Sequence, residues 1–139
     1  MDYRLLVKRV SDVDDSSRRE ILELCERAFD EDFSRFFELM RDTTHVLLRD
    51  DDGRLLSHAA WVERALQPVG LPVLRTAYVE AVATDPDHRE RGLATAVLAR
   101  LTEAVRADER WELAALAPAD ADFYARRGWE PWRGPLALR

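Results

Sequence analysis

The stretch YVEAVATDPDHRERGLATAVLARL, residues 78–101, decides the fold of this chain. It begins as a strand in which one carboxylate, Glu80, stands among apolar residues, and it ends as an amphipathic helix. Gly92 marks the start of that helix, after a turn that contains proline and arginine. Free N–H groups at a helix start attract anions, and glycine has no Cβ to keep a bound phosphate away from the backbone. The stretch therefore indicates a strand–turn–helix unit suited to an anionic ligand.

The motif RERGLA, residues 89–94, leaves two interpretations open when it is considered alone. It is either a phosphate-binding turn or an ordinary loop whose arginines are solvated. It is not a P-loop, because the sequence Gly-Lys-Ser/Thr is absent from it. It is not a dinucleotide-binding fingerprint either, since two of the three required glycines are missing.

The composition is that of one globular domain, residues 1–139, with 47% hydrophobic side chains. The formal net charge of −6 argues against a nucleic-acid partner, which requires a basic surface. The single cysteine, Cys25, lies on the apolar stripe of an expected helix, so we expect a buried structural thiol. The N-terminal segment lacks the apolar core of a signal peptide, and no apolar run has the length of a membrane span. These features predict a cytoplasmic protein without a nucleic-acid or membrane partner.

Hydrophobic periodicity predicts an α/β (α+β) domain with a mixed central sheet flanked by helices. The expected order is strand, two helices, three strands, helix, strand, helix and strand. Asp15 or Ser16 is expected to cap the first helix, and Asp52 with Gly53 to form the turn of a hairpin. Strands are expected at residues 3–10, 44–66 (as the hairpin), 73–84, 111–117 and 129–138. Residues 11–29 are expected to form a turn, a cap and a helix, and further helices are expected at residues 30–40, 92–107 and 118–128.

The segment RERGLA after YVEAVATDPDH resembles the acyl-CoA pyrophosphate loop of the Gcn5-related N-acetyltransferase (GNAT) superfamily. The segment FYARRGWEPW, residues 123–132, is similar to the C-terminal element of that family, in which a tyrosine lies on a short helix before the last strands. More narrowly, AFDEDF, SHAAWVERAL, AYVEAVAT and FYARRGWEPWRGP resemble segments of the aminoglycoside 2′-N-acetyltransferases. The similar segments follow the same order along nearly the whole chain.

Amide formation from a thioester needs a neutral amine, a stabilised oxyanion and a protonated leaving thiolate. Strict alternation along the strand puts Tyr78, Glu80 and Val82 on one face, where apolar neighbours would raise the proton affinity of the carboxylate. The resemblance implies that Glu80 acts as a base on the acceptor amine through water. It also implies that the backbone N–H of Val82 stabilises the oxyanion and that Tyr124 protonates the thiolate of CoA. From the residues alone, Glu80 could equally be a hydrogen-bonded structural carboxylate and Tyr124 a core aromatic.

The resemblance implies acetyl-CoA as the cosubstrate and no metal. The pyrophosphate would be bound by the loop of residues 89–94, chiefly through backbone N–H groups; the cofactor-binding residues are Arg89, Arg91, Gly92 and Ala94. The three histidines, His45, His58 and His88, are scattered in the sequence without the spacing of metal ligands.

One acidic position also matches the aminoglycoside acetyltransferases. In that family the residue corresponding to Asp32, in AFDEDF, faces the amines of the substrate. The nearby Phe33, Phe36 and Phe37 either pack in the core or line the cleft. The family normally continues beyond the position of Arg139 into another strand and an acceptor-binding segment. We therefore expect the last family strand to be missing, because the sequence is incomplete, because a partner chain completes the sheet as in a homodimer, or because the fold is shorter.

The resemblance thus predicts transfer of an acetyl group from acetyl-CoA to a primary amine, with the 2′-amine of an aminoglycoside as one acceptor. A polyamine, another amino-sugar or a protein N-terminus is an alternative acceptor. A second alternative is a CoA-binding module without catalysis. These readings differ in one structural respect: a catalytic domain requires Glu80 and Tyr124 to line the same cleft as the pyrophosphate loop.

Overall fold

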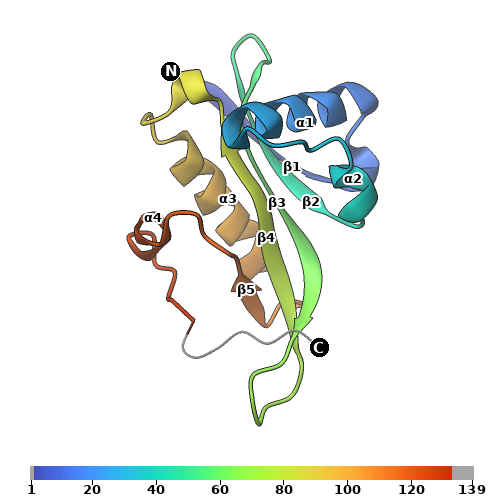
Figure 1. Cartoon of the computed structure of the whole chain (residues 1–139), viewed down its shortest axis with the longest axis vertical. Helices are drawn as coiled ribbons and strands as arrows, with labels where there is room; N and C mark the ends of the chain where they lie inside the picture. The colour runs from blue at the N-terminus through green and yellow to red at the C-terminus, as the bar shows by residue number, and fades with distance from the viewer. Residues whose placement is uncertain (1, 133–139) are drawn as a thin grey trace.

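In the computed structural model, which describes residues 2–132, a five-stranded sheet lies between helices on its two faces (Figure 1). The strands follow one another in sequence order across the sheet; the first four are antiparallel and the last pair is parallel. The predicted mixed sheet and the order of the described elements are confirmed. The strands are β1 (Tyr3–Arg9), β2 (Thr44–Asp50), β3 (Leu55–Leu66), β4 (Leu74–Thr84) and β5 (Leu113–Ala115), and the helices are α1 (Asp15–Phe29), α2 (Phe36–Leu39), α3 (Leu93–Ala107) and α4 (Ala121–Ala125).

The N-cap of helix α1 lies one residue before the first of its two predicted positions. Asp14, and not Asp15 or Ser16, is the N-cap: its carboxylate accepts a hydrogen bond from the Ser17 N–H at 2.8 Å. The buried face of the helix carries Cys25, where burial raises the thiol pKa to about 12. The predicted burial of this thiol is therefore confirmed, and its raised pKa disfavours the thiolate.

Helix α2 is much shorter than the helix predicted for residues 30–40. The carboxylate of Asp32 accepts a hydrogen bond from the Ser34 N–H at 2.8 Å, an Asx turn that competes with helical hydrogen bonding. Only Phe36–Leu39 therefore forms a helix, and Phe36 reaches the core with 8% of its surface exposed. Phe33 and Phe37 pack against the edge of the core.

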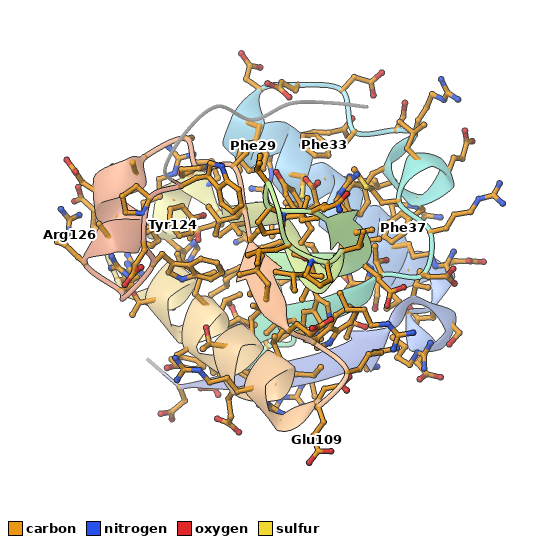
Figure 2. All side chains as sticks on the ribbon, turned by 90° about the horizontal axis from the view of Figure 1, so that it is seen from below. Phe29, Phe33, Phe37, Glu109, Tyr124 and Arg126 are labelled. Carbon is orange, nitrogen blue, oxygen red and sulfur yellow. The ribbon has the colours of Figure 1, made fainter. Side chains whose placement is uncertain are left out.

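The sheet has one hydrophobic cluster on each face. Helix α3 covers one face and α1 the other, as seen from below in Figure 2. On the α3 side the cluster centres on Trp61, Val97 and Leu101; on the α1 side it centres on Ile21, Leu24 and Leu47. Each of the strands β1 to β4 contributes residues to both clusters, so the sheet is buried on its two faces.

The partner of β4 on its outer side is short. β5 pairs only with Thr76, Ala77 and Tyr78, so the following half of β4 has no strand beside it on this edge in the described chain. The strand predicted at residues 129–138 falls largely outside the described residues, and residues 129–132 have no regular secondary structure. None of the helices within residues 2–132 has the length and apolar character needed to span a membrane.

The end of β4 is fixed by a buried carboxylate, Asp85. Its Oδ2 atom lies 3.1 Å from both Arg27 of α1 and Arg54 of the β2–β3 loop, while Oδ1 accepts from the Asp87 N–H. Its own N–H donates to the Leu56 carbonyl of β3 at 2.8 Å. Asp85 thus joins three parts of the chain at the point where β4 enters the turn before α3.

We expect Asp85→Asn to lower the free energy of unfolding by about 2–3 kcal/mol, because both arginines lose their anionic partner. The cost stays below that of a fully buried pair because the arginine side chains are about half exposed. The matched control, Glu38→Gln, removes a pair in which both side chains are exposed and should cost less than about 1 kcal/mol. Urea denaturation compares the variants, and equal losses would contradict this role of Asp85.

Candidate functional site

A groove of about 930 Å³ opens between the second half of β4, the start of α3 and helix α4. It brings together six of the residues expected to form the site: Glu80, Val82, Arg89, Gly92, Ala94 and Tyr124. The described residues that line the groove do not include Arg91 or Asp32. A second hollow of about 510 Å³, beside Trp111 and Trp129, contains none of the expected residues.

A β-bulge in β4 shapes the floor of this groove. Ala60 pairs with Glu80 and His58 pairs with Ala83, so β4 carries one residue more than β3 across this interval. Ala81 adopts a left-handed conformation with φ 56°. The predicted alternation is therefore wrong beyond Glu80: Val82 packs toward α3, on the face opposite to that of Glu80.

The Glu80 side chain is half-buried, with 26% of its surface exposed, and faces an arginine from β3. Arg64 Nη2 lies 3.4 Å from Glu80 Oε1, and its guanidinium lies 5.0 Å from the centre of the Tyr78 ring. Burial raises the pKa of Glu80 above its ordinary value, while the positive charge of Arg64 opposes that rise. The carboxylate is thus a stronger base than an exposed glutamate.

The loop before α3 presents its backbone to the groove. Gly92 is the N-cap of α3 with φ 75°, and no side chain caps this end of the helix. The first helical hydrogen bond runs from the Ala96 N–H to the Gly92 carbonyl, so the N–H groups of Leu93, Ala94 and Thr95 precede the helical ladder. Such a helix start, with its dipole, is an anion site.

The Arg89 side chain is engaged elsewhere in the structure. Its Nη2 donates to the Ala28 carbonyl near the end of α1 at 3.1 Å. The residue therefore ties the loop to α1, and backbone groups of the loop remain the candidates for binding an anion. Arg91 is exposed outside the lining of the groove.

Tyr124 lies on α4, on the side of the helix that faces the groove, whereas Arg126 points away from it (Figure 2). Its ring packs edge-on against Phe123 and Trp129, with centroids 5.1 and 6.2 Å apart. Burial raises the pKa of the phenol, with Arg127 opposing the rise, so the hydroxyl keeps its proton at neutral pH. Arg127 also donates to Thr95 Oγ1 at 2.8 Å, which joins α4 to the start of α3.

Asp32 lies apart from these groups. It is exposed, and its carboxylate accepts the Ser34 N–H in the turn before α2. The hydrogen bond lowers its pKa, so the carboxylate is ionised at neutral pH. Its role toward an acceptor stays a prediction.

The structure also contains a polar cluster that the sequence did not reveal. His45 and His58, which are distant in the sequence, are in direct hydrogen-bond contact at 2.8 Å in the interior beneath Phe37. Thr43 bonds to the far side of His45. The description of the histidines as scattered therefore fails for this pair. In residues 2–132 no group of three or more His, Cys, Asp or Glu side chains has the arrangement of a metal site.

Comparison with known proteins shows the family of the chain. Residues 9–132 match the model of the acetyltransferase (GNAT) domain. The chain is 37% identical over 131 residues to the aminoglycoside 2′-N-acetyltransferase of Mycolicibacterium fortuitum. This alignment covers 92% of this chain and 65% of that protein. It is 35% identical over 89 residues to the N-acetyltransferase Eis of Mycobacterium tuberculosis, covering 62% of this chain and 22% of Eis.

Among solved structures, a predicted acetyltransferase from Clostridium acetobutylicum, determined with acetyl-CoA, superimposes with a TM-score of 0.73. The match covers 99% of this chain and 96% of that one at 15% identity, so it supports the fold alone. The match to the domain model over residues 9–132 defines a protein of the acetyltransferase class. The chain belongs to the GNAT acetyltransferase family, and it spans just under two thirds of the M. fortuitum relative and about a fifth of Eis.

We expect Arg64→Gln to raise the pKa of Glu80 further, because the positive charge that opposes the effect of burial is removed. Carbon-13 NMR of the labelled carboxyl group, followed over a pH titration, measures this directly. Arg35→Gln is the control, since Arg35 pairs with the exposed Glu38 and should leave Glu80 unchanged. A pKa that stays constant or falls in Arg64→Gln would contradict the assigned contact.

Proposed function

We propose that this domain transfers the acetyl group of acetyl-CoA to a primary amine. The observation that carries the proposal is the shared groove, in which Glu80 and Tyr124 lie with the uncapped start of α3. A groove with one basic carboxylate, one protonated phenol and a helix N-terminus offers groups for each requirement of amide formation from a thioester. Membership in the GNAT family supports the choice of acetyl-CoA as donor.

The residues have complementary roles in this reaction. Glu80 accepts the proton of the bound ammonium group, through water, and so generates the free amine. The amine nitrogen attacks the carbonyl carbon of the thioester, and the N–H of Val82 stabilises the oxyanion that forms. When the C–S bond breaks, the hydroxyl of Tyr124 donates its proton to the departing thiolate. The second proton that the acylated nitrogen loses returns through water to the phenolate of Tyr124, and Glu80 releases its proton to solvent. The products are an N-acetylated amine and CoA.

Binding of the cosubstrate is assigned to the loop of residues 89–94. The pyrophosphate would lie at the start of α3, where the helix dipole and backbone N–H groups favour negative charge. Gly92 and Ala94 line the groove at this position, and Arg89 holds the loop against α1. The side chain of Arg91 lies outside the groove lining, so it would contribute positive charge to pyrophosphate binding only from a distance.

For the acceptor we propose a cationic amine, with the 2′-amine of an aminoglycoside as the first candidate. The support is the 37% identity to an aminoglycoside 2′-N-acetyltransferase, the net charge of −6 and the ionised Asp32. An acidic protein attracts polycations by long-range electrostatics. Other small amines, a protein N-terminus, or CoA binding without catalysis remain the competing readings.

The decisive experiment measures release of the free CoA thiol from acetyl-CoA in the presence of tobramycin, spermidine or a simple monoamine. We expect turnover, and the highest kcat/KM with the polycations. Tyr124→Phe should lower kcat by about a hundredfold while the Kd for acetyl-CoA is retained, because the variant loses only the proton donor. No turnover with any amine would refute the transferase, and full activity of Tyr124→Phe would leave the tyrosine a packing role.

Variants of Gly92 test the cosubstrate site. A Cβ at Gly92 would meet no protein atom within 4 Å, so a loss of CoA affinity on substitution reports crowding by the ligand. The left-handed φ of 75° should make Gly92→Val less stable by about 1–2 kcal/mol, whereas asparagine tolerates this conformation better.

We therefore expect both Gly92→Val and Gly92→Asn to weaken CoA binding in titration calorimetry, with a clear fall in melting temperature only for valine. Unchanged CoA affinity in the asparagine variant would show that the ligand does not approach this backbone.

A further inference from the structure

Three fully buried polar side chains form a line that leads to the bulge of β4. Thr43 Oγ1 lies 2.7 Å from His45 Nε2, His45 Nδ1 lies 2.8 Å from His58 Nε2, and His58 Nδ1 lies 2.9 Å from the Ala81 carbonyl oxygen. Each of the three residues is at most 1% exposed. Burying such a polar line is costly unless every member is paired, and here every ring nitrogen has a partner.

The Ala81 carbonyl, at the end of the line, determines which nitrogen of each histidine carries the proton. A carbonyl oxygen can only accept, so His58 carries its proton on Nδ1 and presents Nε2 as an acceptor. His45 must then donate from Nδ1, which leaves its Nε2 to accept from the Thr43 hydroxyl. Burial lowers the pKa of His45 to about 3 and that of His58 to about 4, so both rings stay neutral and the order of donors is preserved.

The carbonyl at the end of this line belongs to a special peptide group. Ala81 is left-handed, which costs an alanine about 1–2 kcal/mol and requires support from its surroundings. The Ala81 carbonyl and the Val82 N–H are the two ends of one planar trans peptide, so they point in opposite directions. With the carbonyl held by His58 of β3, the Val82 N–H points away from β3, and Val82 lines the groove on the other side of β4.

We propose that the Thr43–His45–His58 line is a positioning device that fixes the Ala81–Val82 peptide so that its N–H is aimed at the thioester carbonyl. This inference rests on the proposed function, in which that N–H stabilises the oxyanion. The hydrogen bond to the carbonyl also polarises the peptide and makes the N–H a better donor. The histidines never touch the substrate; they act through one peptide group.

Loss of the aimed N–H should have an effect on binding that a loss of packing would not have. Acetyl-CoA has a thioester carbonyl and CoA has none, so loss of the aimed N–H should affect acetyl-CoA and spare CoA. It should also lower kcat, because the N–H matters most when the oxyanion forms.

Two amide variants of His58 separate the hydrogen bond from the packing. His58→Asn places its amide nitrogen near the position of Nδ1 and can still donate to Ala81. In His58→Gln the side-chain amide lies near the position of Nε2, where it faces His45. The Ala81 carbonyl is then left unpaired. Each variant leaves one buried partner of His58 unsatisfied, so their stabilities should fall by similar amounts, which thermal melts record.

We expect the wild-type protein to bind acetyl-CoA more tightly than CoA, because only acetyl-CoA accepts the aimed N–H. His58→Gln should remove this preference in titration calorimetry and reduce kcat by about tenfold or more, since misplacing an oxyanion donor forfeits part of its effect. His58→Asn should retain both properties to within about threefold, because the donor is kept. Equal kinetic and binding behaviour of the two variants, or a parallel loss of CoA affinity in His58→Gln, would overturn the proposal.

Nitrogen-15 NMR of the wild-type imidazoles tests the same idea without any variant. Near neutral pH, both His45 and His58 should be neutral and protonated on Nδ1, and a His58 protonated on Nε2 would overturn the proposal. A wild-type protein that does not bind acetyl-CoA removes the proposed function, whereas turnover with equivalent Asn and Gln variants removes only the positioning device.

Discussion

The site depends on one extra residue in β4. The bulge at Ala81 lets two neighbouring positions serve opposite faces of the sheet: Glu80 points to the side of α1 and α2, and Val82 packs toward α3. In a regular strand these two residues would share a face. The bulge therefore places the proposed side-chain base and the proposed backbone donor within three residues on opposite faces. Its cost is a left-handed alanine, and the buried hydrogen bond from His58 offsets part of that cost.

The groove itself follows from the limited pairing of the neighbouring strand. β5 stays beside β4 for three residues and then leaves it, while the chain passes into α4. The second half of β4 thus has its bulge next to an open space rather than next to a strand. Arg127 draws α4 against the start of α3 through Thr95, so the tyrosine and the helix N-terminus border the same space. An unpaired strand edge can pair with other chains, but here the open edge of β4 forms one wall of the groove.

Much of this architecture could be predicted from the sequence, because periodicity reports which face of an element is buried. The helix after Gly92, the hairpin turn at Gly53 and the carboxylate in β4 all follow from local patterns. The bulge could not be predicted, since Ala81 has none of the side-chain features that favour a left-handed backbone. The pairing of His45 with His58 depends on strand register and on that same bulge, which are tertiary properties. Helix α2 was overestimated because the Asx turn at Asp32 competes locally with helix formation.

The arginines around the groove bear on how an acidic protein could bind the proposed pyrophosphate group. Arg89 is bound to the end of α1 and Arg127 to Thr95 and the Phe123 carbonyl, so both are committed to holding the walls in place. The positive potential then comes from fixed backbone N–H groups and the dipole of α3, which add no formal charge. In the proposed function, the net charge of −6 acts on the acceptor amine. The proposal thus divides the electrostatics in two: backbone dipoles attract the anionic donor at one end of the groove, and carboxylates attract the cationic amine over the surface around it.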